Sequence, residues 1–162
     1  MLSELFKQLD TLTHESNRER TEEGVPTITV AEFRVVGQMA LWEADLGLDL
    51  AATHDLDAFV RAEYWTQKRF EELLGRHGLI LDEQSELIWM PQETAYQTIY
   101  QGRWVTGMVA QPEYVLISKA RTAPQKNRSL LIEYIAQRAS DLFFTLAETY
   151  KLDLEGLMQD DI

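Results

Sequence analysis

Asp55 and Asp57 are the two side chains whose type and spacing best suit metal chemistry. On a strand, residues i and i+2 point to the same face, so both carboxylates can reach one metal site while Leu56, Ala58 and Val60 point the other way. Carboxylate oxygens are preferred ligands of Mg²⁺, which neutralises the charge that develops on a phosphoryl group. Aspartates with this spacing are also common on solvated strands, so the pair alone leaves a structural interpretation open.

A glycine at the end of a short apolar segment precedes these aspartates. Val35 and Val36 predict a strand, Gly37 interrupts it, and the residues from Gln38 onward predict a short helix. Glycine lets the backbone approach a phosphate closely, and a helix N-terminus favours phosphate through its free N–H groups and its dipole. A turn of this kind next to a strand with two carboxylates predicts nucleotide chemistry.

Three stretches carry a family resemblance. Val35–Leu41 and Thr53–Phe59 resemble the signature of the DNA polymerase β-like nucleotidyltransferase superfamily, and they are most similar to the branch of the abortive-infection nucleotidyltransferase toxins and its bacterial relatives. Val109–Lys119 resembles the Pro-Glu helix start and the following lysine of the same branch.

The resemblance implies a fold, a cofactor and a site. It implies a nucleotidyltransferase-like mixed β-sheet flanked by helices, with Mg²⁺ held by Asp55 and Asp57 as the catalytic carboxylates. It also implies a nucleoside triphosphate whose phosphates lie near Gly37 and Gln38, with Lys119 facing the nucleotide.

The sequence also departs from the family pattern. Gln38 replaces the second small residue of the turn, the stretch 50–52 lacks an arginine, and Asn127 stands where relatives carry an aspartate. A third carboxylate has no assigned position, because Glu86 and Glu93 only flank an apolar predicted strand.

Two functions therefore remain open, beside the possibility that the pattern is accidental and the domain is an unrelated α/β protein. One is a magnesium-dependent enzyme that transfers a nucleotidyl group to an unknown acceptor. The other is a catalytically inactive module of the same fold that binds a protein partner, for example within a toxin–antitoxin pair.

Charge and composition restrict the partners. The chain has 162 residues, a net charge of −12 and no cysteine, so it has neither a disulfide nor a cysteine nucleophile. An acidic chain disfavours general nucleic-acid binding, since binders of polyanions carry basic surfaces. No apolar run is long enough for a membrane span, and the N-terminus lacks the core of a signal peptide, so we expect a cytoplasmic protein.

The elements that must position the site follow from hydrophobic periodicity and from glycine and proline. We expect a single mixed α/β (α+β) domain over residues 1–162, with an N-terminal helix and polar loop in 1–24 and helices in 128–162. The polar stretch 15–24 can end the first helix or form a loop. Further predicted helices cover 38–45, 64–77 and 112–119, and one long helix runs along a stripe from 131 to 150. Predicted strands are 33–36, 55–60, 79–81, 86–90, 98–100 and 104–109.

Two side-chain groups have a structural and a functional interpretation. We expect the four tryptophans to fill the core rather than to stack on bases. The only concentration of basic residues can either bind phosphates or cap neighbouring helices, and the second role is favoured; its members are Lys119, Arg121, Lys126 and Arg128.

Overall fold

The computed structural model describes residues 1–159. Within them the α-helices are α1 (Leu2–Glu23), α2 (Gly37–Ala44), α3 (Tyr64–Gly75), α4 (Pro112–Thr122), α5 (Arg128–Gln137), α6 (Asp141–Thr149) and α7 (Leu154–Met158). The strands are β1 (Ala31–Val36), β2 (Asp55–Arg61), β3 (Ile80–Leu81), β4 (Tyr96–Gln101) and β5 (Val105–Ala110), and a short 3₁₀ helix, η1, covers Ser85–Leu87.

The strands form one mixed sheet in the order β3-β2-β1-β5-β4. Strand β2 runs antiparallel to β1 and parallel to β3. Strand β5 runs parallel to β1 and antiparallel to β4, with which it forms a hairpin. The expected mixed α/β class is confirmed.

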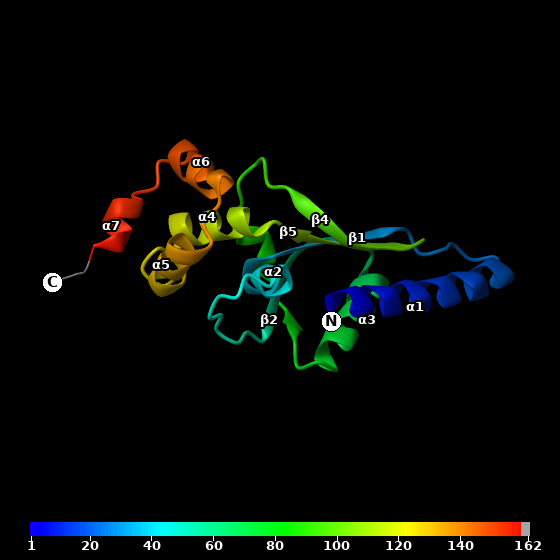
Figure 1. Cartoon of the computed structure of the whole chain (residues 1–162). Helices are drawn as coiled ribbons and strands as arrows, with labels where there is room; N and C mark the ends of the chain where they lie inside the picture. The colour runs from blue at the N-terminus through cyan, green and yellow to red at the C-terminus, as the bar shows by residue number, and fades with distance from the viewer. Residues whose placement is uncertain (160–162) are drawn as a thin grey trace.

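Helices α1 and α3 lie together on one side of this sheet, and α4 to α7 gather beyond one end of it (Figure 1). The rings of Phe6, Phe33 and Phe70 join α1, β1 and α3, with centroids 4.5 to 5.5 Å apart. Gly107 of β5 lies directly under Phe6, so a Cβ atom there would overlap the ring. The aromatic cluster therefore depends on a glycine in the neighbouring strand.

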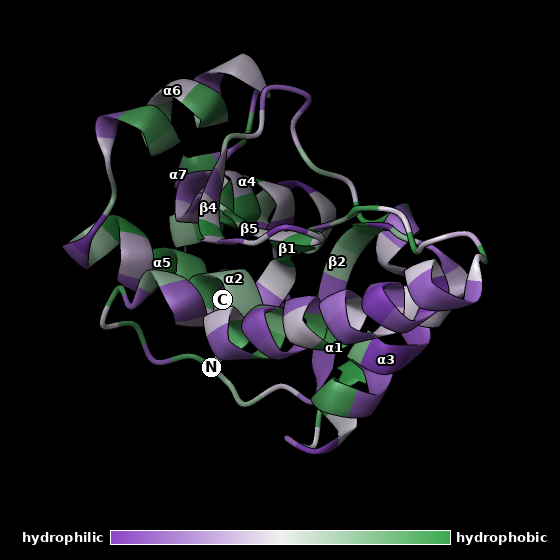
Figure 2. Ribbon diagram, turned by 90° about the vertical axis from the view of Figure 1, so that its right-hand side faces the viewer, coloured by the Kyte–Doolittle hydropathy of each residue, from purple (hydrophilic) through white to green (hydrophobic). Residues whose placement is uncertain are grey.

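The polar stretch after the first apolar turns is helical. Helix α1 continues to Glu23 and ends at Gly24, whose φ of 70° is in the left-handed region that favours glycine. Its outward face is hydrophilic (Figure 2). Buried Asn17 holds the returning chain, since its Oδ1 accepts from Ile28 N at 2.7 Å and its Nδ2 donates to Ile28 O at 3.1 Å.

The predicted strand over 86–90 is wrong. Ser85–Leu87 forms the 3₁₀ helix η1, and Leu87 is 80% exposed. The extended residues that follow pair with no strand in the described chain. Instead the Trp89 carbonyl accepts a hydrogen bond from Ser118 Oγ on α4. A strand forms when its backbone groups pair with those of a neighbouring strand. Here the Ser118 side chain bonds to the Trp89 carbonyl instead.

The single long C-terminal helix is also wrong, because it is divided into α5 and α6. Ser140 caps α6, with its Oγ accepting from Phe143 N at 3.2 Å, and its own N–H donates to the Tyr134 hydroxyl at 3.3 Å. A serine that accepts from the N3 amide begins a new helix. The apolar stripe continues through both helices because each packs its own apolar face inward.

The tryptophans do not fill the core as expected. Trp42 is 47% exposed, and Trp65, Trp89 and Trp104 are half-buried. Each of these three carries an arginine guanidinium over its ring, at 4.2 to 5.4 Å. An indole can cover apolar surface with one face while a cation packs on the other.

No helix within residues 1–159 is long and apolar enough to cross a lipid bilayer.

Candidate functional site

The turn at Gly37 lies against the Asp57 carboxylate. Antiparallel pairing of β1 and β2 places Val36 opposite Asp57, and Gly37 follows at once. Gly37 has a φ of 67°, and a Cβ atom on it would lie 2.5 Å from Asp57 Oδ2. Glycine is thus required for two reasons, its left-handed backbone and the close approach of the carboxylate. Sequence reasoning placed these two elements together, and in the structure they are adjacent.

A third acid, Asp82, joins this pair of elements. Parallel pairing sets Leu56 beside Leu81, and Asp82 N donates to Leu56 O at 2.9 Å just beyond the end of β3. The Asp82 carboxyl group lies close enough to that of Asp57 to raise the pKa of Asp57. Sequence analysis did not assign Asp82. The available signal was an acid that directly follows the predicted strand 79–81.

A serine turn fixes the position of Asp82. Buried Ser85 donates from Oγ to Asp82 O at 2.7 Å and accepts from Ala58 N at 3.1 Å. Gln84 N donates to Asp82 Oδ1 at 2.8 Å. The segment after β3 is thereby tied to β2, and the two carboxylates are held together by backbone geometry.

The two flanking glutamates lie elsewhere. Glu93 accepts a hydrogen bond from the Tyr150 hydroxyl, and Glu86 is exposed on η1. Neither lines the hollow next to Asp57.

The environment of Asp57 raises its pKa from 3.8 to about 6. Burial is the largest cause, followed by the hydrogen bond with Asp82 and the negative charges of Asp82 and Asp55. The positive charge of Lys119 lowers the pKa and offsets part of this effect. Asp57 therefore lies where a cation would relieve an electrostatic cost.

Asp55 and Gln38 lie outside the hollow. Asp55 is exposed at the start of β2, on the same face as Asp57 by strand alternation. Gln38 Nε2 donates to Ala51 O at 3.1 Å, which ties its side chain to the loop 46–54. Gln38 therefore does not occupy the space beside Gly37, although it replaces the second small residue of the turn.

A hollow of 190 Å³ opens between this carboxylate region and helix α4. Gly37 and Asp57 line one side of it, and Lys119 and Lys126 line the other. Burial and the charge of Lys126 both lower the pKa of Lys119, while Asp57 raises it. Ile88, Met90, Val115, Ser118, Thr122, Ala123 and Asn127 complete the lining.

The basic residues divide between the two roles considered from the sequence. Lys119 and Lys126 face the hollow, and neither forms a salt bridge within residues 1–159. Arg121 packs over the Trp89 ring at 4.2 Å. Arg128 donates to the carbonyl groups of Leu157 and Gln159, and so fastens the chain around α7.

The residues present fit a divalent cation that is shared with a ligand. In the described chain no group of three or more acidic or histidine side chains is arranged to enclose a metal. Magnesium is ordinarily held by one or two carboxylates together with substrate phosphates and water, rather than by a cage of protein ligands. Asp57 lines the hollow, and Asp82, which lies beside Asp57 but outside the lining, supplies the second carboxylate.

Comparisons of the chain with profiles of protein families, with curated proteins and with solved structures found no match.

Proposed function

We propose that the protein is a magnesium-dependent nucleotidyltransferase that transfers a nucleotidyl group from a nucleoside triphosphate to an acceptor hydroxyl. The observation that supports this most is the opposition of Asp57 and Lys119 across one hollow, with the left-handed Gly37 turn at its edge. A magnesium–polyphosphate complex has the matching charge pattern, since its cation requires carboxylates and its phosphates require ammonium groups.

The lysines support a polyanionic ligand. Lys119 is partly buried and repelled by Lys126, and both effects lower its pKa. Phosphate oxygens between the two ammonium groups would relieve that repulsion and offset the burial cost. The hollow is smaller than a whole nucleotide site, which is usually 300 Å³ or more, so it suits the phosphates while the nucleoside extends into solvent.

The carboxylates support the transfer step. Asp57 and Asp82 would hold Mg²⁺, with Asp55 on the same face as a further ligand. The bound ion would neutralise charge on the phosphates and polarise the phosphorus for attack. The acceptor oxygen bonds to the α-phosphorus, the bond to pyrophosphate breaks, and a carboxylate takes the hydroxyl proton.

Calorimetric titration with ATP, with and without MgCl₂, tests the binding half of this proposal. We expect magnesium-dependent binding that falls at least about tenfold in Asp57→Asn, Asp82→Asn and Lys119→Met. Two surface substitutions, Asp49→Asn and Lys7→Met, are the matched controls and should leave the affinity unchanged. Equal affinity in wild type and the site variants would refute the assignment.

Release of pyrophosphate from ATP separates an enzyme from an inactive module. We expect slow release with water or the protein's own hydroxyl groups as acceptor, and mass spectrometry would detect a self-attached nucleotide. Binding without release or attachment would instead favour the non-catalytic module that binds a protein partner.

A further inference from the structure

A second and larger pocket lies on the other side of α2. It has a volume of 580 Å³, within the range of 300 to 1,000 Å³ typical of small-molecule sites. Met39, Trp42 and Leu79 supply apolar walls, together with Met1 at the rim. Trp42 and Met1 are 47% and 53% exposed, so this apolar surface is open to solvent.

The pocket is built on one face of α2. Met39, Trp42 and Glu43 lie three and four residues apart, and helical side chains with this spacing point the same way. The opposite wall is the loop 46–54, which Gln38 holds against α2 through its hydrogen bond to Ala51 O. The walls are thus tied together by the same glutamine, whose side chain does not line the hollow beside Gly37.

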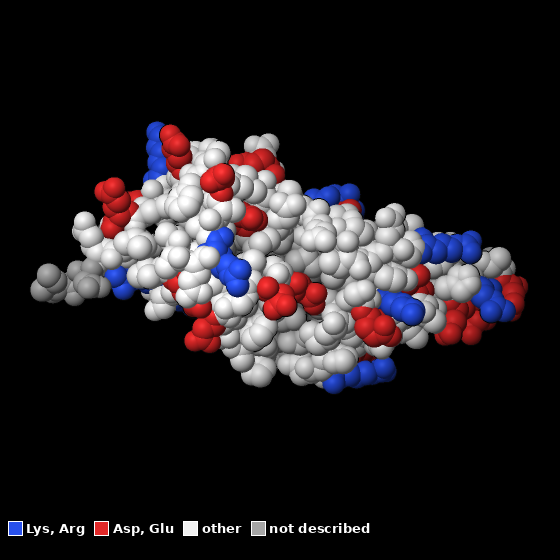
Figure 3. All heavy atoms as spheres, in the orientation of Figure 1, with Lys and Arg blue, Asp and Glu red and all other residues white. Residues whose placement is uncertain are grey.

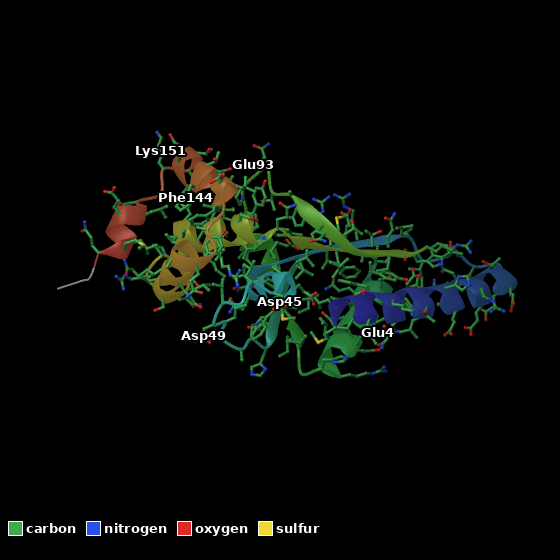
Figure 4. All side chains as sticks on the ribbon, viewed as in Figure 1. Glu4, Asp45, Asp49, Glu93, Phe144 and Lys151 are labelled. Carbon is green, nitrogen blue, oxygen red and sulfur yellow. The ribbon has the colours of Figure 1, made fainter. Side chains whose placement is uncertain are left out.

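The two acidic side chains at this pocket are unpaired. Glu43 and Asp45 line it, and neither has a salt bridge or a side-chain hydrogen bond within residues 1–159. Met1, which carries the N-terminal ammonium, and His77 also line the pocket, but neither forms an ion pair with Glu43 or Asp45, and no lysine or arginine is among the lining residues. Figure 3 shows acidic atoms on this face, over the place where Figure 4 labels Asp45 at the end of α2.

The Trp42 ring adds a second feature that suits a cation. Its indole N–H has no hydrogen-bond partner in the described part of the chain, and none of the cationic side chains there stacks on its ring. This distinguishes it from the other tryptophans, whose rings each carry an arginine. A tryptophan face attracts an organic cation more strongly than any other side-chain ring.

From this combination we propose that the pocket beside Trp42 binds a small organic cation, an amine with an apolar or aromatic body. The apolar walls take the body, and the Trp42 ring together with Glu43 and Asp45 takes the charge. The net charge of −12 raises the local concentration of such cations at the surface. The proposal does not depend on the nucleotidyltransferase assignment, although Thr53 brings the pocket close in sequence to Asp55.

The test compares two molecules of one shape. Phenethylamine and 2-phenylethanol carry the same aromatic body, the first with a charge and the second without. Each is titrated to about 10 mM while NMR follows the chemical shift of the Trp42 indole N–H. A Trp42→Phe variant assigns that signal. We expect the amine to bind at least about tenfold more tightly than the alcohol. Equal affinity, or no shift of the Trp42 signal with the amine, overturns the proposal.

A double variant isolates the two acids. Glu43→Gln with Asp45→Asn should remove the preference for the amine and leave binding of the alcohol unchanged. Asparagine suits position 45 because the φ there is 49°, a left-handed conformation that asparagine tolerates. The control pairs Glu19→Gln with Glu148→Gln, two exposed positions outside the pocket lining, and lowers the net negative charge by the same amount. An equal loss in that control would assign the effect to overall charge and refute the site.

Discussion

Replacement of Asp57 by asparagine should stabilise the fold at neutral pH. The asparagine side chain has the same shape as the protonated carboxyl, so it fits beside Gly37 and can donate to Asp82 at any pH. The pKa of Asp57 is about 6 in the folded chain against 3.8 ordinarily, a difference of about 2.2 pH units. At about 1.36 kcal/mol per pH unit this limits the cost of the charged form to about 3 kcal/mol. Because the side chain is half-exposed and screened by solvent, we expect Asp57→Asn to raise the free energy of unfolding by about 1–2 kcal/mol.

The sign of the pH dependence follows from proton binding. Below pH 3.8 the Asp57 carboxyl is protonated in both states, and between 3.8 and 6 the unfolded chain loses its proton first. The unfolded state then binds fewer protons, so the stability of the wild type falls as the pH rises through this window. The advantage of Asp57→Asn should therefore grow with pH, from about a third of its full value at pH 4.5 to the full value above pH 7.

Urea unfolding at pH 4.5, 6.0 and 7.5, in buffer with a chelator, measures this effect. Asp49→Asn is the matched exposed control and should change little. Added MgCl₂ should raise the free energy of unfolding of the wild type more than that of Asp57→Asn, since a ligand of the folded state stabilises it by mass action. A variant that is less stable than the wild type at pH 7.5, or a difference that does not vary with pH, would refute the electrostatic account.

Three further substitutions test the local geometry by thermal or urea unfolding. Gly37→Ala should lower the free energy of unfolding by about 2–3 kcal/mol, because the left-handed backbone is strained and the new Cβ atom meets the Asp57 carboxylate. Gly24→Ala has the same backbone strain but open space around it, so it should lower the free energy of unfolding by only about 1 kcal/mol. Equal losses at the two glycines would contradict the close approach. Gly107→Ala should cost about 1–3 kcal/mol by forcing apart the aromatic cluster of α1, β1 and α3, and a neutral result would place the ring elsewhere. Ser140→Ala should cost about 1 kcal/mol through loss of the α6 cap, and an unchanged midpoint would argue against that cap.

Local signals in the sequence were sufficient for most elements. Apolar spacing predicted α1, a glycine predicted the end of β1, and Pro112 predicted the start of α4, because each of these depends on neighbours a few residues away. The failures came where a distant partner decides the outcome. Residues 86–90 look like a strand, but within residues 1–159 they pair with no strand, and the stripe from 131 to 150 does not reveal that Ser140 begins a second helix.

The candidate site divides in the same way. Asp55 and Asp57 on one strand face, and Gly37 at a turn, were determined by the sequence, because strand alternation and glycine's backbone freedom are local properties. Only the tertiary structure decided that Asp82 lies beside Asp57, that Gln38 turns toward Ala51, and that Lys119 lies across the hollow from Asp57. Those relations depend on strand order and on packing of α4 beyond the sheet. Residues distant in the chain become neighbours only when backbone hydrogen bonds and core burial bring their elements together.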